Sequence, residues 1–120
     1  MASILRFAIC AALLIPLFGC GLAQQAEIQK ASEDAKQVMQ AEIAECERLH
    51  PSKTQRPVIP RIRCLKDART KFAEVARGLG DKNYDQHMLV LAKILVIAEQ
   101  YDAGKLTEAQ FELQKAQAVS

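Results

Sequence analysis

The sequence predicts an all-α protein, a small three- or four-helix bundle with one disulfide, preceded by a cleaved signal peptide. Two observations indicate this class. Apolar residues recur at steps of three and four over long stretches of the chain. Prolines gather within residues 51–60 and glycines within residues 78–80, and both residue types end helices.

The first nineteen residues have the anatomy of a secretory signal peptide. A cationic start at Arg6 precedes the 12-residue apolar run 7–18, and Gly19 precedes Cys20. The run is shorter than the roughly 20 residues that a spanning helix needs. We therefore expect residues 1–19 to be removed.

The stretch Leu17-Phe18-Gly19-Cys20 resembles the lipobox of bacterial lipoproteins. The resemblance implies lipid on Cys20, and hence a membrane anchor made of several acyl chains. Gly21, where an Asp would favour the inner membrane, implies the outer membrane with the body facing the periplasm. The alternative is an ordinary cleaved signal, which would leave Cys20 near the start of a soluble protein.

After a short tether at residues 20–25, the helical domain is expected over residues 26–120. The first helix covers 26–50 and carries an alanine-rich apolar stripe. Residues 51–60 form a stiff surface crossover, because each proline lacks an amide donor and biases its predecessor to extended geometry. The second helix covers 61–78 with Leu65 and Phe72 on its apolar side, and Gly78 and Gly80 supply its left-handed stop.

The third helix is capped by Asp81 or Asn83 and contains the nearly uninterrupted apolar run Met88–Ala98. A short buried strand competes for this run, but its length favours a helix. A helix that is apolar on nearly every side is either the centre of a bundle or a face for self-association or a protein partner.

The last helix has the clearest local signal. Thr107 and Gln110 form a capping box, and Leu106 and Phe111 occupy the hydrophobic-staple positions. Residues 95–115 resemble the short SHOCT-type motif of bacterial proteins, which implies a helical clasp, sometimes linked with oligomerisation, and no chemistry. Two well-capped helices would give the same letters by convergence.

Cys46 and Cys64 remain after removal of the signal and modification of Cys20. In an oxidising envelope they are expected to form a disulfide between the first two helices. A zinc site that adds His50 and His87 is the alternative, but the close ligand pairs typical of zinc sites are missing. We expect no metal and no cofactor.

The composition argues against catalysis and nucleic-acid binding. The chain is almost neutral at +2, it has no Trp, and no Gly-x-Ser-x-Gly elbow is present. Carboxylate pairs such as Glu42 and Glu45 fall on an expected solvated face. We expect no enzyme activity.

Residues 53–77 hold eight basic side chains and two acidic ones. The favoured explanation is charge complementarity between the first two helices. The sharper hypothesis is that Lys53, Arg56, Arg61 and Arg63 project toward an anionic surface such as phospholipid head groups.

The expected function is a membrane-anchored, non-enzymatic structural or interaction module of the bacterial envelope. The alternative is a periplasmic helical binding module for a small apolar or anionic ligand, held between helices.

Overall fold

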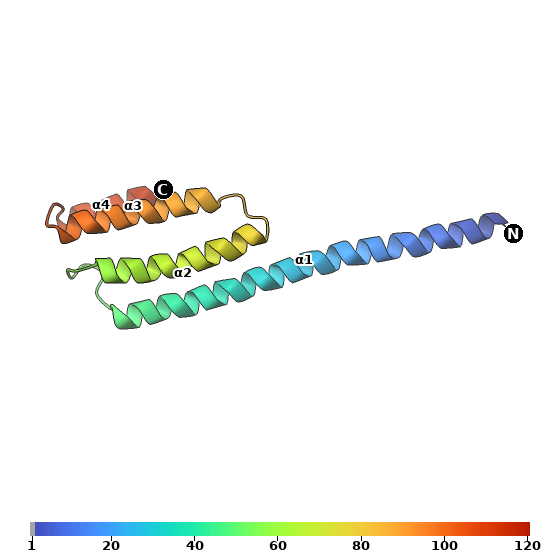
Figure 1. Ribbon diagram of the computed structural model, residues 1–120, viewed down its shortest axis with the longest axis horizontal. Helices are drawn as coiled ribbons and strands as arrows, with labels where there is room; N and C mark the ends of the chain where they lie inside the picture. Colours follow the sequence, from blue (N-terminus) through green and yellow to red (C-terminus); the bar gives the residue numbers. More distant parts are fainter. Residues whose placement is uncertain (1) are drawn as a thin grey trace. The chain divides into compact units, whose positions relative to one another are not determined.

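A computed structural model describes the backbone of residues 2–120 and the side chains from Gly21 onward. The described chain is all-helical, as predicted: α1 (Ala2–Leu49), α2 (Ile59–Gly78), α3 (Tyr84–Asp102) and α4 (Glu108–Val119) (Figure 1). The side chains of the predicted signal peptide and of Cys20 lie outside the described residues. Within the described part of the chain, no helix is both long and apolar enough to cross a membrane.

The chain divides into two units, one up to Asp34 and one over Ala35–Ser120. In the first unit, residues 20–25 belong to α1 rather than to a separate tether, and the side chains of 21–30 are exposed. Leu22 is 67% exposed. No packing of these side chains therefore contributes to the helix.

In the second unit, α2 packs against α3, and α3 packs against α4 (Figure 1). The last turns of α1 are joined to α2 by the Cys46–Cys64 disulfide. Two faces of α2 are thus used: Cys64 and Lys71 face α1, while Ile62 belongs to the core on the other side.

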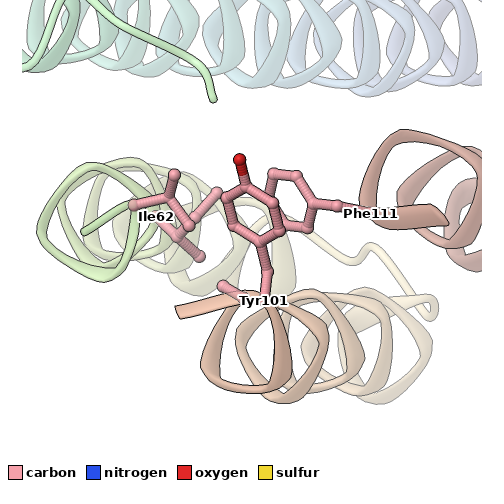
Figure 2. Close-up of a cluster of buried hydrophobic side chains, with 5 residues drawn as sticks. Ile62, Tyr101 and Phe111 are labelled. Atoms are coloured by element: carbon pink, nitrogen blue, oxygen red, sulfur yellow. The ribbon is translucent and has the colours of Figure 1, made fainter. Parts of the chain in front are cut away.

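The hydrophobic core lies where the 50–58 loop meets the α3–α4 corner. It consists of five buried residues, Val58, Ile62, Ala98, Tyr101 and Phe111. The Tyr101 and Phe111 rings stack with centroids 4.3 Å apart, beside Ile62 in Figure 2. Such a pair contributes roughly 0.5–1.5 kcal/mol beyond its area burial.

The helix ends correct several local predictions. α2 begins at Ile59, two residues early, with Pro60 in its first turn, where a missing amide costs nothing. Its stop uses only Gly80, whose φ is +103°, while Gly78 stays in the helix. Asn83 is the α3 N-cap, but its side chain makes no capping bond.

The last helix agrees with the prediction. Thr107 accepts a hydrogen bond from the Gln110 backbone N–H at 3.2 Å, and the Gln110 side chain accepts one from the Thr107 N–H at 2.9 Å. Leu106 packs against the core cluster that contains Phe111. Gly104, with φ +78°, makes the turn.

Candidate functional site

The proline loop is bound to the α3–α4 corner by contacts across more than forty residues. Asp102, at the end of α3, accepts hydrogen bonds from the backbone N–H groups of Val58 (2.8 Å) and Ile59 (3.0 Å). These amides open α2, so its N-terminal cap comes from another helix. The Tyr101 hydroxyl donates to the Thr54 carbonyl.

Arg56 makes the reciprocal contact. Its guanidinium donates to the carbonyls of Tyr101 (Nε, 2.8 Å) and Leu106 (Nη2, 2.8 Å) and lies 4.0 Å from the Tyr101 ring centroid. A cation at the carbonyl end of α3 is favourable. The loop is therefore more than a surface crossover. Val58 is buried, and the hydrogen bonds of Asp102 and Arg56 hold the loop against the α3–α4 corner.

Of the four cations predicted to project toward an anionic surface, two make hydrogen bonds within the fold, although Arg56 stays exposed. Arg56 is held at the corner, and Arg61 is 8% exposed. Arg61 donates from Nε to the His50 carbonyl at 3.1 Å, and its Nη2 lies 3.9 Å from Glu47. It thus complements the C-terminus of α1. Lys53 and Arg63 are exposed.

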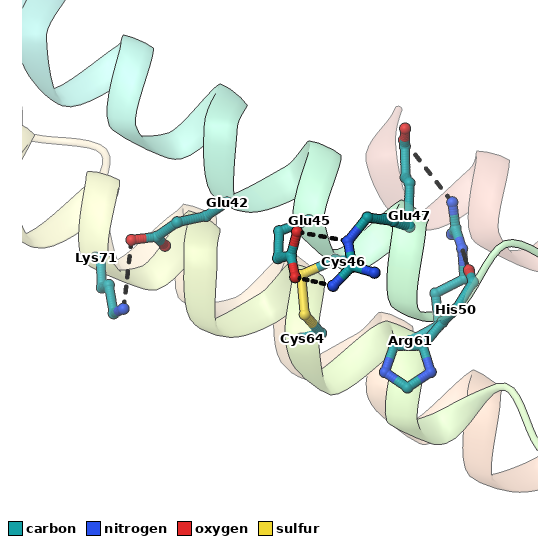
Figure 3. The surroundings of a disulfide bond; sticks show 9 residues. Glu42, Glu45, Cys46, Glu47, His50, Arg61, Cys64 and Lys71 are labelled. Carbon is teal, nitrogen blue, oxygen red and sulfur yellow. Dashed lines mark hydrogen bonds and ion pairs between the residues drawn. A yellow bond between two sulfur atoms is a disulfide. The ribbon is translucent and has the colours of Figure 1, made fainter.

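The disulfide and its neighbours join α1 to α2 (Figure 3). Cys46 is buried, and the Cα atoms of Cys46 and Cys64 are 5.7 Å apart. Lys71 Nζ lies 3.4 Å from Glu42 Oε1. The predicted complementary charges of these helices therefore meet in at least one ion pair, and both thiols are removed from the zinc alternative.

Within α1, Arg48 donates two hydrogen bonds to Glu45, at 2.9 and 2.6 Å. These bonds lower the pKa of the Glu45 carboxyl and raise that of the Arg48 guanidinium. Both side chains are in solvent, so the pair adds little to stability.

A groove follows α2 and α3, and we call it the α2–α3 groove. Its first section, about 510 Å³, lies between α2, α3 and α4. Its second section, about 610 Å³, continues toward the α2–α3 turn, and Met39 of α1 also lines it. The sections share Arg69, Leu91, Ile94 and Val119 as lining residues, so they adjoin.

Helix lengths explain why the groove is open. At about 1.5 Å per residue, α3 (19 residues) is about 28 Å long and α4 (12 residues) about 18 Å. α4 starts at the α3–α4 corner, where the hydrophobic core lies. It ends at Val119, which lines the groove together with Leu91 near the middle of α3. The first half of α3 is therefore not covered by α4.

The groove has an apolar floor. Large side chains from both helices line it and stay only half-buried, namely Leu65, Phe72, Val90, Leu91 and Ile94. By contrast, Phe111 in the hydrophobic core at the α3–α4 corner is fully buried. Apolar surface left open along a groove is a common feature of binding sites.

The rim of the first section is cationic. Lys66 and Arg69 lie one helical turn apart on α2 and line it, and neither has an ion-pair partner among the described side chains. Lys115 and Glu112, which also line it, pair with each other at 2.9 Å. The unmatched positive charge of the rim is therefore that of Lys66 and Arg69.

The far end of the groove is polar. Asp81 Oδ2 lies 3.8 Å from His87 Nε2 there. Among the described residues, no group of three His, Cys, Asp or Glu side chains is arranged to hold a metal ion.

The sequence analysis did not identify this groove. Leu65 and Phe72 were placed on the apolar face of the second helix, and Lys66 and Arg69 were counted only in the overall charge. The available signal was their spacing, because residues 65, 69 and 72 share one helical face.

The Met88–Ala98 segment is helical and lies in α3 between α2 and α4, which confirms the helix over the strand. Two of its side chains stay outside the core: Leu89 is 56% and Val96 is 51% exposed.

No protein-family model, curated protein or solved structure matches this chain.

Proposed function

We propose that this chain is a bacterial envelope lipoprotein, held at a membrane by acyl chains on Cys20, and that its helical body is a non-enzymatic interaction module. The observation that carries the proposal is Leu17-Phe18-Gly19-Cys20 directly after a 12-residue apolar run. Several acyl chains on one cysteine make anchoring stable, whereas a single chain binds only marginally.

The disulfide supports the compartment. Cys46 and Cys64 are bonded, and structural disulfides persist in the oxidising bacterial periplasm and not in a reducing cytosol. This agrees with export of the helical domain.

The contacts at the corner support a non-enzymatic body. The polar groups of Asp102, Tyr101 and Arg56 are engaged in capping helices and fixing the loop. Exposed apolar side chains on the outer surface of the helices support an interaction role, with Leu89 and Val96 on α3 and Leu113 on α4.

Membrane fractionation tests the anchor. Wild-type protein is expected to remain with the membrane fraction until detergent is added. Cys20→Ala is expected to abolish acylation, so this variant should no longer partition into the detergent phase as a lipoprotein. Cys10→Ala is the matched control, since it changes a cysteine inside the predicted signal and leaves the modified sulfur intact. Equal detergent partitioning of wild type and Cys20→Ala would contradict the proposal.

A further inference from the structure

We infer that the α2–α3 groove binds a free single-chain amphiphile, an unbranched acyl chain that ends in one anionic group. The chain lies along the apolar floor, and the anion is bound by Lys66 and Arg69. The inference depends on the fold of residues 35–120 and is independent of lipidation at Cys20.

The size and shape of the groove favour a small, elongated occupant. Its sections of about 510 and 610 Å³ fall in the range of roughly 300–1,000 Å³ that is typical of small-molecule sites. Because Leu91 and Ile94 line both sections, the apolar floor extends from one section to the next along α3. A compact ligand would leave most of this floor in water.

The positive charge on the groove rim favours an anionic end group on the ligand. Lys66 is half-buried, while Arg69 is exposed at the junction of the two sections. Neither has an acidic partner among the described side chains, and the nearby Glu112 is already paired with Lys115. An anion bound in the first section at Arg69, which also lines the second, would therefore be one helical turn from Lys66, and both cations are uncompensated. Charge-assisted hydrogen bonds of this kind are the stronger ones.

The two ends of the groove differ in a way that suits such a ligand. Beyond Arg69 the floor continues with Phe72 and Val90 before the polar pair Asp81 and His87. An acyl chain that starts at the junction can thus run along apolar side chains. A neutral hydrocarbon would make no charged interaction with the cations, and a small anion without an acyl chain would bury no apolar surface on the floor.

Isothermal titration calorimetry tests the inference on the full chain carrying Cys20→Ala, so that no attached acyl chain competes. The probes are decanoate, 1-decanol and acetate, each below its aggregation limit and at a pH where decanoate is ionised. We expect saturable binding of decanoate, at least tenfold weaker binding of 1-decanol, and no binding of acetate.

Rim variants locate the site. Lys66→Gln combined with Arg69→Gln should weaken decanoate binding about tenfold and leave 1-decanol binding unchanged. The matched control is Arg63→Gln with Lys82→Gln, two exposed cations that do not line the groove, and it should bind decanoate like the parent. The apolar run 7–18 is common to all these proteins, so binding there cannot produce the difference.

Three results would overturn the inference: no saturable binding of decanoate, equal affinity for decanoate and 1-decanol, or unchanged affinity in the rim variant. Phosphatidylglycerol vesicles form a separate arm. Binding to vesicles without binding to monomeric decanoate would also overturn it, because the partner would then be a membrane surface and not a free amphiphile.

Discussion

Replacing Asp102 by alanine tests the long-range cap of α2. The Asp102 carboxylate accepts two backbone hydrogen bonds, from Val58 at 2.8 Å and Ile59 at 3.0 Å. Alanine at an N-cap costs about 0.5–2 kcal/mol, and a hydrogen bond to a charged group contributes about 1.5–3 kcal/mol. Because Asp102 is half-buried and bonds both amides, we expect the upper part of the cap range, about 2 kcal/mol.

The free energy of unfolding is measured by urea titration followed by far-ultraviolet circular dichroism. A loss of about 2 kcal/mol corresponds to a fall of about 8–16 °C in Tm for a domain of this size. Asp102→Asn keeps one acceptor oxygen, so it should lose less than the alanine variant. Asp67→Ala, an exposed acidic residue within α2, is the matched control and should change stability by less than about 0.5 kcal/mol.

The reasoning is refuted if Asp102→Ala and Asp67→Ala unfold at the same urea concentration. The start of α2 would then be stabilised by burial of Val58 alone, and the two amide bonds would be incidental.

Four further changes test separate parts of the fold. Replacing both Cys46 and Cys64 by alanine should lower the free energy of unfolding by about 3 kcal/mol, from the entropy of closing a loop with a sequence separation of 18; a reductant that leaves the wild-type melting curve unchanged would contradict this. Thr107→Ala removes the capping box and should cost about 1 kcal/mol in urea unfolding. Gly104→Ala forces a side chain into φ +78° and should cost about 1–2 kcal/mol. Gly78→Ala, in a helical position with nothing within 4 Å of the added methyl group, should be neutral or stabilising by up to about 1 kcal/mol in the same assay; a Tm lower for Gly78→Ala than for Gly104→Ala would be the opposite of the expected order.

Local signals in the sequence predicted the elements well where the deciding contacts are themselves local. The capping box of Thr107 and Gln110 spans three residues, and its geometry matches the prediction. The helix over Met88–Ala98 depends on a similarly short pattern. The Cys46–Cys64 pairing was predicted from the small number of cysteines and from the expectation of an oxidising compartment, and the disulfide is present.

Contacts between distant residues were not predictable in this way. α2 starts at Ile59 because Asp102, 43 residues away, accepts its first amides. Arg56 and Arg61 looked like loop cations free to meet a surface, but carbonyls at the ends of α3 and α1 engage them. Nothing in the local sequence records which carbonyl lies within reach of a guanidinium.

The α2–α3 groove depends on a relation between elements and not on any one of them. Its floor is open because α4 is shorter than α3, and Lys66 and Arg69 become its rim only when α2 packs on α3. Helical periodicity placed Leu65 and Phe72 on an apolar face but could not say that this face would stay half-covered.

The central claim is that the sulfur of Cys20 carries lipid. Mass spectrometry of the N-terminal peptide, from protein made in a bacterium with lipoprotein-processing enzymes, measures this directly. We expect a peptide that starts at Cys20 and carries the added mass of a diacylglycerol and an amide-linked acyl chain. A peptide that begins at Met1, or that contains an unmodified Cys20 thiol, would contradict the account.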